Sequence, residues 1–458
     1  MMYDRYAVVI IGAGPAGLMA ADRIARAGLR TLLLDENPGP GGQVWRSITT
    51  GPAFVRDALG RDYGMGADLV AKARASGAEI VQGATVWSLD RTLELGVSID
   101  GGSRFVQAGR VIIATGALER PFPIPGWTLP GVMSAGGAQT MLKSSGLVPT
   151  GPTVLAGQGP LLWLLAGQIL RLGGRIDLVL DTMDRRTYRA ALRHAPAFMN
   201  SPYLLKGLAM MREVRRQVPV ARGVTALAAE GDGQVDAVRF TARGVEGRIA
   251  TELLLLHQGV VPNVNLAMAA GLRHQWSPTQ LCWAPLLDDG LQGSMPGIYV
   301  AGDGGGIGGM QSAIARGLVA AEAVLGRPSR RARTLLRRAE RGRAFLDAVF
   351  QPPPQFRIPE GDTIVCRCEE VTAQEVLDAV AIGAAGPNQL KAYCRAGMGP
   401  CQGRLCGLTV TELIASARGR DPAEIGHYRL RAPVKPITLA ELAALPKSER
   451  ALEAVVRP

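Results

Sequence analysis

The first 35 residues hold the pattern that most restricts the possible folds of this chain. An apolar run at residues 6–11 leads into the turn Gly12-Ala-Gly14-Pro-Ala-Gly17, which is followed by a helical pattern and a second apolar run that ends at Asp35. This order of strand, G-x-G-x-x-G, helix, strand and acid predicts a Rossmann-type dinucleotide site. Gly12 permits the tight turn, Gly14 lets a pyrophosphate approach the helix N-terminus, and Gly17 lets helix and strand pack closely. Asp35 can accept hydrogen bonds from ribose hydroxyls.

Three further segments indicate that the dinucleotide is FAD. Gly42 and Gln43 follow the acid, residues 112–116 form a strand that runs into a small-residue turn, and residues 297–303 form a strand that ends in Gly-Asp. The last segment resembles the second FAD-binding segment of flavoproteins with two dinucleotide-binding domains. That resemblance implies that Asp303 contacts the ribityl chain, and the alternative for this residue is an ordinary helix cap. The candidate FAD-binding residues are Gly12, Gly14, Pro15, Ala16, Gly17, Asp35, Glu36, Gly42, Gln43, Val86, Ala114, Thr115, Gly116, Gly302, Asp303 and Gln311.

Four of the six cysteines fall in two tight pairs near the C-terminus. Cys366 and Cys368 form a C-x-C pair, and after 32 intervening residues Cys401 and Cys406 form a C-x4-C pair. Thiolates gathered from two loops suit an iron–sulfur cluster or zinc. Structural zinc knuckles favour C-x2-C pairs, and the rest of the chain has flavoprotein segments, so a [2Fe–2S] cluster is favoured and zinc is the alternative. Cys394 is a spare candidate ligand.

The segment 149–276 begins like a second nucleotide-binding unit that has diverged. Gly157 and Gly159 keep the first two glycines of the turn, but Leu162 stands in place of the third. His257-Gln-Gly occurs where a small-residue turn is usual in NAD domains. We therefore expect a retained fold, in which NAD(P)H use is doubtful and the site is empty or holds another adenine nucleotide.

The positive charge of the chain is concentrated in one segment. The formal net charge is +12, and residues 327–343 hold eight Arg and one Glu without an aromatic residue. No base-stacking platform is present there, so a solvated or partner-facing helix is expected and nucleic-acid binding is not. A basic scaffold that binds duplex DNA is the alternative from another functional class.

Several absences narrow the chemistry and the compartment. The N-terminus lacks a signal-peptide pattern, and no apolar run reaches the roughly 20 residues that span a bilayer, so we expect a cytoplasmic protein without a membrane span. The segment after Gly42 has no cysteine, the middle segment has no C-x2-C, and Cys282 stands alone, so redox-disulfide chemistry is not expected. No catalytic residue is assigned, although the loop of His257 should face the flavin.

Over nearly its whole length the chain resembles the α subunits of bacterial heteromeric FAD-dependent amine dehydrogenases. The group includes octopine and nopaline (opine) oxidases, hydrogen cyanide synthase, and hydroxyproline or proline dehydrogenases, and the α subunit of heterotetrameric sarcosine oxidase is a more distant relative. The resemblance rests on the four-cysteine segment, on Gly41-Gly-Gln, and on residues 114–121, 125–133 and 431–438.

This resemblance implies a division of labour within a hetero-oligomer. A partner β flavoprotein subunit would oxidise a secondary amine or amino acid, and a small ferredoxin-like γ subunit often joins the complex. The chain would hold FAD and, in a bacterioferritin-associated-ferredoxin-like domain, a [2Fe–2S] cluster on Cys366, Cys368, Cys401 and Cys406. The alternative is a self-sufficient NAD(P)H-dependent reductase that delivers electrons to a partner. The surviving Gly157 and Gly159 of the second nucleotide-binding turn favour this alternative.

The expected fold is a doubly wound α/β flavoprotein with an inserted NAD-type domain and a small cluster domain. The predicted divisions are the FAD domain at 1–148 and 277–326, the NAD-type domain at 149–276, an Arg/Pro-rich linker helix at 327–358, the cluster domain at 359–420 and a C-terminal tail at 421–458.

Overall fold

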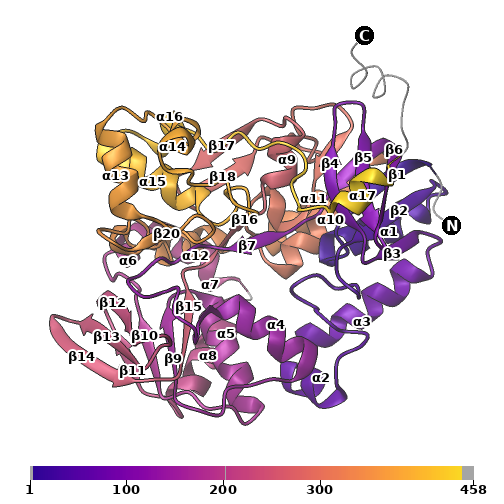
Figure 1. Cartoon of the computed structure of the whole chain (residues 1–458). Coiled ribbons are helices and arrows are strands. Elements are labelled where there is room, and N and C mark those ends of the chain that lie inside the picture. Colours follow the sequence, from indigo (N-terminus) through magenta and orange to yellow (C-terminus); the bar gives the residue numbers. More distant parts are fainter. Residues whose placement is uncertain (1–3, 202, 446–458) are drawn as a thin grey trace.

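The computed structural model describes residues 4–201 and 203–445, so the last part of the predicted tail, residues 446–458, lies outside the described residues. Figure 1 shows three units: a seven-stranded sheet at the right, a five-stranded sheet at the lower left, and a helical domain with the four cysteines at the upper left. No helix in the described ranges is long and apolar enough to cross a membrane.

The first sheet has the parallel core of a dinucleotide-binding fold. Strand β1 lies between β2 and β6, β3 pairs with β2, and β19 pairs with β6, all in parallel. The long strand β6 also pairs with β5 in antiparallel fashion, and β4 continues this meander. The strands are β1 (Arg5–Ile11), β2 (Thr31–Asp35), β3 (Glu79–Gln82), β4 (Thr85–Leu89), β5 (Glu94–Ile99), β6 (Gly102–Ile113) and β19 (Ile298–Val300).

Helices α1 (Pro15–Ala25) and α10 (Met310–Val324) bring the two ends of the first unit together. Pro15 opens α1 at a position where its missing N–H loses no hydrogen bond. The two helices pack closely because Gly317 has no side chain: a Cβ there would lie 2.2 Å from the carbonyl oxygen of Ala16. Segments almost 300 residues apart in the sequence therefore build one site.

The second sheet is inserted between the two halves of the first unit. The chain leaves through β7 (Ala117–Glu119) and returns through β16 (Val260–Pro262), and these strands pair with each other in antiparallel fashion. The sheet order is β11-β10-β9-β15-β8, and β8 joins it although it precedes residue 149. Its strands are β8 (Val132–Ser134), β9 (Thr153–Gly157), β10 (Leu178–Asp181), β11 (Val220–Arg222) and β15 (Leu253–His257).

Helices and a small meander complete this second unit. The meander contains β12, β13 and β14 in antiparallel order. Helices α4, α5 and α8 pack on one another beside the sheet. The bounds are α4 (Ala135–Ser145), α5 (Pro160–Arg171), α6 (Thr187–Ala191), α7 (Ala195–Met199), α8 (Tyr203–Arg215), β12 (Val224–Glu230), β13 (Ala237–Ala242) and β14 (Val245–Ala250).

The segment predicted as one linker helix contains two. Helix α11 (Arg330–Ala339) carries most of the arginines, and α12 (Arg343–Val349) follows after Gly342, whose φ of 84° breaks the helical path. The side chain of Ser329 caps α11 by accepting the N–H of Ala332 at 3.2 Å. The chain then turns into the cysteine domain.

The cysteine domain is helical and is joined to the rest of the protein by specific polar contacts. Helix α13 starts with a capping box between Thr372 and Glu375. The indole N–H of Trp127 donates to the carbonyl oxygen of Ile364 at 2.7 Å, and Arg357 forms an ion pair with Glu412. Its elements are β20 (Ile364–Cys366), β21 (Val371–Thr372), α13 (Ala373–Ala381), α14 (Pro387–Cys394), α15 (Gly407–Arg418) and α16 (Pro422–Ile425).

Candidate cofactor sites

A cavity of about 960 Å³ connects the predicted FAD residues with the other two units. All of the candidate FAD-binding residues line it except Gly17 and Gln311. Gln311 is exposed in the first turn of α10, and the neighbouring Met310 lines the cavity instead. The cavity extends past the second glycine turn at Gly159 to Arg404, in the loop between Cys401 and Cys406.

The first glycine turn is shaped by backbone contacts that exclude side chains. Gly12 has a φ of 106°, and a Cβ on it would lie 2.5 Å from the carbonyl oxygen of Ala114. A Cβ on Gly17 would lie 1.9 Å from the carbonyl oxygen of Gly12. Gly14 is different, because a Cβ there would be 3.8 Å from the nearest atom, the Cα of Gly42. The absent side chain of Gly14 therefore leaves space in the cavity for a ligand.

The acidic residues at the end of β2 are held by the turn and by the tail. Asp35 accepts the N–H of Ala13 at 2.5 Å on one oxygen, and the N–H and side-chain amide of Asn37 at 2.8 and 2.7 Å on the other. Glu36 accepts a hydrogen bond from Nζ of Lys435 at 2.5 Å. Lys435 also lines the cavity, so the C-terminal tail contributes to this end of the site.

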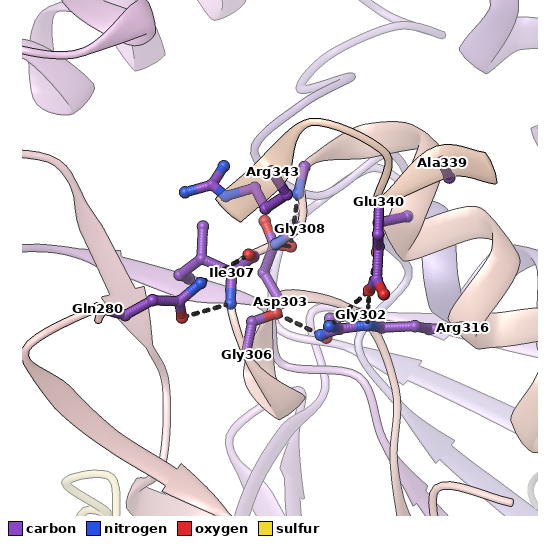
Figure 2. A network of polar contacts seen from close by, with 12 residues as sticks. Gln280, Gly302, Asp303, Gly306, Ile307, Gly308, Arg316, Ala339, Glu340 and Arg343 are labelled. Atoms are coloured by element: carbon purple, nitrogen blue, oxygen red, sulfur yellow. Dashed lines mark hydrogen bonds and ion pairs between the residues drawn. The ribbon is translucent and has the colours of Figure 1, made fainter. Parts of the chain in front are cut away.

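Asp303 lies in the short 3-10 turn Gly302–Gly305, after β19, and organises the loop that leads to α10. One of its carboxylate oxygens accepts the N–H of Gly308 at 2.9 Å and that of Gly309 at 3.0 Å (Figure 2). Both of these N–H groups precede α10, whose N-cap Gly309 has no side-chain cap, so Asp303 orders the loop before the helix and also lines the cavity. Figure 2 shows Gln280 reaching the same loop, where its side-chain oxygen accepts the N–H of Ile307 at 3.1 Å.

Two basic residues of the cavity were not predicted from the sequence. Nζ of Lys143, on α4, donates to the carbonyl oxygens of Gln43 and Val44 at 2.8 and 3.1 Å and to the side chain of Gln139 at 3.0 Å. Burial, followed by the charge of Arg46, lowers the pKa of Lys143 to about 7. No local pattern marks Lys143, since the two carbonyl groups that it contacts lie about 100 positions away in the sequence. The second basic residue is Arg120, which belongs to the segment 114–121 and is buried in the wall of the cavity. Burial lowers the pKa of Arg120 to about 10.

The second glycine turn keeps its backbone shape but faces the contact between His257 and Glu119. Gly157 has a φ of 140°, and a Cβ on it would lie 1.7 Å from the carbonyl oxygen of His257. Nδ1 of His257 lies 2.6 Å from Oε1 of Glu119, and the other carboxylate oxygen of Glu119 accepts the N–H of Gly136 at 2.7 Å. The other ring nitrogen of His257 is on the side of Gly159. His257 itself lines the cavity, so its loop faces the space that the FAD-binding candidates share.

The segment that follows α12 bonds directly to the second turn. The side-chain amide of Gln158 donates to the carbonyl oxygen of Phe350 at 3.1 Å. The hydroxyl of Thr187 donates to the carbonyl oxygen of Val349 at 2.8 Å. Thr187 starts α6, just beyond β10, where the ribose of a dinucleotide would lie in a Rossmann unit. The chain itself therefore occupies space next to this turn.

The four predicted cysteine ligands come together as two pairs of thiols. Cys366 interacts with Cys406, and both are buried, whereas Cys368 interacts with Cys401 nearer the surface. Among residues 4–201 and 203–445, no three His, Cys, Asp or Glu side chains are arranged to hold one metal ion. Two separate thiol pairs match a centre with two metal ions better than a single-ion cage. Cys394 donates a hydrogen bond to the carbonyl oxygen of Leu390, with its Sγ 3.7 Å from that oxygen, and it lies near Cys366 without belonging to either thiol pair.

The buried thiol pair lies in an environment that stabilises a thiolate. The hydrogen bond from Cys406, together with backbone N–H groups that include Gly397, lowers the pKa of Cys366 to about 5. The N–H of Gly397 lies 3.5 Å from Sγ of Cys366. Cys366 and burial raise the pKa of Cys406 well above its usual range, and the hydroxyl of Tyr428 acts on it in the opposite direction. These groups fit a thiolate-ligated metal centre.

Comparisons with known proteins match both parts of the chain. The model of the pyridine nucleotide-disulphide oxidoreductase family matches residues 6–317, and that of the sarcosine oxidase A3 domain matches residues 360–445. The A chain of the opine oxidase of Agrobacterium tumefaciens (strain Ach5) is 46% identical over 99% of this chain and 94% of its own length. The HcnB component of the hydrogen cyanide synthase of Pseudomonas aeruginosa is 33% identical over 94% of this chain and 96% of its own length.

A solved structure has the same fold across almost the entire chain. The L-proline dehydrogenase of P. horikoshii superposes with a TM-score of 0.70 at 19% identity, covering 96% of this chain and 79% of that one. The fold therefore extends beyond the flavoprotein part into the cysteine domain.

Proposed function

The chain belongs to the pyridine nucleotide-disulphide oxidoreductase family and to the family of opine oxidase A subunits, and on that premise we propose that it is the electron-transferring subunit of a hetero-oligomeric amine dehydrogenase. It binds FAD at the first glycine turn and a [2Fe–2S] cluster at the four cysteines. A partner β flavoprotein subunit carries the substrate site, and the substrate is a secondary amine or amino acid, such as an opine, proline, hydroxyproline or a glycine-like compound. The opine oxidase relative is named as one of several subunits, which supports a multi-subunit assembly.

The observation that carries this proposal is the continuity of one cavity from the first turn to the cysteine loop. Gly12 and Gly14 line one end of the cavity. Another part is lined by Arg404, which lies two residues before the predicted iron ligand Cys406. A protein that relays electrons must hold its redox centres near each other and set their potentials, and it needs no substrate pocket of its own. One cavity lined by residues of both predicted sites supports the first requirement, that the redox centres lie near each other.

The residues of the first turn fit FAD. The N-terminus of α1 and the open space at Gly14 suit a pyrophosphate, and Asp35 and Glu36 suit ribose hydroxyls. Lys143 is placed to hold the backbone of Gln43 and Val44 in position. FAD supplies reversible two-electron chemistry when bound, and these residues bind and orient it.

The cysteines fit a cluster with two irons, which exchanges single electrons when bound. Cys366 and Cys406 provide a buried pair and Cys368 and Cys401 provide an outer pair. Backbone N–H groups directed at a thiolate, such as that of Gly397, stabilise the anionic ligand. Zinc remains the alternative occupant, and metal analysis separates the two.

The second turn gives little support to the alternative function, a self-sufficient NAD(P)H reductase. Gly159 lines the cavity, but hydrogen bonds from Gln158 and Thr187 hold the segment at Val349 and Phe350 next to the turn, in the region that the dinucleotide would need. Leu162, which is 1% exposed, packs in the core at the position of the third glycine. We infer that this site does not serve NAD(P)H, and that any adenine nucleotide in it has a structural role.

The test is a cofactor analysis of the full chain, produced with its genomic neighbours under anoxic and iron-replete conditions. We expect one FAD, two irons and two acid-labile sulfides for each copy of the chain. Cys401→Ser should remove the iron while FAD stays bound, whereas Cys394→Ser and Cys282→Ala should keep both cofactors. Loss of iron in Cys394→Ser, or zinc in place of iron, would contradict the ligand assignment.

The division of labour is tested by comparing the chain alone with the complex. We expect the isolated chain to show no amine oxidation with opines, proline, hydroxyproline or glycine, and the complex to oxidise one of these classes. If the isolated chain oxidised an amine at the rate of the complex, the substrate site would lie in this chain and the proposal would be wrong.

A further inference from the structure

Tyr428 is the aromatic centre of the cysteine domain. Its ring is 2% exposed and packs against three glycines that flank or separate the cysteines. A Cβ on Gly397 or Gly403 would lie 2.5 Å from a ring carbon of Tyr428, and a Cβ on Gly407 would lie 3.1 Å from one. These glycines therefore leave the space that the ring fills, and the ring cannot shift without disturbing the cysteine loop.

The hydroxyl of Tyr428 is buried without a hydrogen-bond partner in the part of the chain that the structure describes. Buried tyrosine hydroxyls usually find a partner, because an unpaired one costs about 1–3 kcal/mol. Lys391 does not provide it, since its Nζ lies over the face of the ring, 4.7 Å from the centroid. Tyr428 packs in one buried cluster with Cys366 and Cys406. Its Cζ, the carbon that bears the hydroxyl, faces Gly397, whose N–H lies 3.5 Å from Sγ of Cys366, so the hydroxyl end of the ring lies beside the buried thiol pair.

A purely structural role would be filled better by phenylalanine. The same ring would pack against the same glycines, and no polar atom would be buried. The retained hydroxyl next to a buried metal-ligand candidate therefore points to an interaction with that ligand. With the Tyr428 hydroxyl, each sulfur of the buried pair would have one hydrogen-bond donor, because the N–H of Gly397 is already directed at Sγ of Cys366.

We propose that Tyr428 is a positioning residue for the iron–sulfur cluster, whose hydroxyl donates a hydrogen bond to the sulfur of Cys406 and thereby raises the midpoint potential of the cluster. This inference rests on the proposed function, since it requires Cys406 to be an iron ligand. Reduction adds one electron and negative charge to the cluster and its sulfurs, so a donor to sulfur stabilises the reduced form more than the oxidised form. The proton stays on the tyrosine oxygen, and no bond is broken.

The direct test is the substitution Tyr428→Phe in the full complex, with a redox titration followed by EPR. We expect the cluster to accept an electron about tenfold less favourably, which is ~59 mV in a one-electron couple. Iron and FAD contents should match those of the unmodified complex. Tyr393→Phe is the matched control, because Tyr393 is in the same domain but is 51% exposed, and the potential of the cluster should not change in that variant.

A second variant keeps the test decisive if Tyr428→Phe loses its iron. Site-specific 3-fluorotyrosine at position 428 keeps the ring and the hydroxyl but makes the hydroxyl a stronger donor, so it should raise the potential. An unchanged potential in an iron-replete Tyr428→Phe complex, or in the fluorotyrosine complex, would overturn the inference. If the unmodified complex held no iron–sulfur cluster, the proposed function itself would fail, and that outcome is distinct.

Discussion

The two glycine turns of this protein, at residues 12–17 and 157–162, have the same first glycine geometry but differ in their third position and in the chain segment beside them. In both, the first glycine is required because the next strand of the sheet approaches it: a Cβ would lie 2.5 Å from the oxygen of Ala114 at Gly12 and 1.7 Å from that of His257 at Gly157. The third glycine is needed only in the first turn, where α1 sits directly on the turn. In the second turn, Leu162 occupies that position within the core.

The fold and the ligand site of such a turn therefore have separate requirements. Strand and helix form around the second turn without the third glycine, as the parallel pairing of β9 with β10 and β15 shows. Gly14 and Gly159 both line the cavity, but the second turn also has the segment at Phe350 bonded to it through Gln158. A turn can thus keep its nucleotide-binding shape while the chain itself takes the adjacent space.

The largest expected effect comes from making the first turn resemble the second. In Gly17→Leu, a Cβ would lie 1.9 Å from the oxygen of Gly12, so α1 must move away from β1. We expect a loss of more than about 4 kcal/mol in the free energy of unfolding and a colourless or insoluble protein. The control Leu162→Met conserves volume in the second turn and should cost less than about 1.5 kcal/mol with full flavin content. A yellow, stable Gly17→Leu protein would contradict the role given to close packing.

The second position of each turn gives opposite predictions for alanine. Gly14→Ala has room in the protein and an ordinary φ of −77°, so the melting temperature of the flavin-free chain should not change. The new methyl group points into the cavity, and we expect FAD affinity to fall about 10- to 100-fold, or ~1.4–2.8 kcal/mol. Fluorescence titration of the flavin-free chain measures this change.

Gly159→Ala should show the reverse behaviour. Its φ of 98° lies in a region that favours glycine, so alanine should cost about 1–3 kcal/mol in stability. FAD affinity should stay within twofold of the unmodified value. If Gly159→Ala weakened FAD binding as much as Gly14→Ala, the two turns would not be functionally separate.

The acids that follow the two turns should differ in their response to neutralisation. Asp35→Asn places an amide against backbone N–H donors, so we expect a loss of about 1–3 kcal/mol and weaker FAD binding. Asp181 is the corresponding acid of the second turn, and burial raises its pKa above the ordinary 3.8. Asp181→Asn should therefore stabilise the protein by about 1 kcal/mol at pH 7.

The pH dependence of that gain has a definite sign. Between 3.8 and the raised pKa of Asp181, the folded state binds more protons than the unfolded state, so stability falls as the pH rises through this window. The difference between Asp181→Asn and the unmodified protein should grow over this window and stay constant above it. Denaturant unfolding at several pH values measures it, and a loss of stability in Asp181→Asn at pH 7 would contradict the argument.

The smallest expected effect concerns the cavity rim. Lys435→Met removes the ion pair with Glu36 at the first turn, and exposed pairs contribute only about 0–1 kcal/mol, so FAD affinity should fall two- to fivefold. Lys206→Met is the matched control, because Lys206 pairs with Asp62 in another part of the cavity and should leave FAD affinity unchanged. Equal effects of the two variants would exclude a specific role for the tail.

Local patterns in the sequence predicted the fold class and the family, and both are confirmed. Gly12, Gly14 and Asp35 were recognisable because strand, turn and helix follow one another directly. Lys143 could not be found in this way, since its role depends on carbonyl groups about 100 residues earlier. Tyr428 and Phe350 were missed for the same reason: each acts on a distant loop, and neither belongs to a periodic or spaced pattern. The cysteine ligands and the individual FAD contacts stay predictions.

We infer that electrons do not enter this chain from a nicotinamide at the second turn. Anaerobic titration of the purified complex with NADH and then NADPH, monitored by flavin absorbance, tests it most directly. We predict that the flavin stays oxidised with both nucleotides, and that dithionite then reduces the flavin and the cluster. Rapid bleaching of the flavin by either nucleotide would contradict the account and assign the second turn to a reductase.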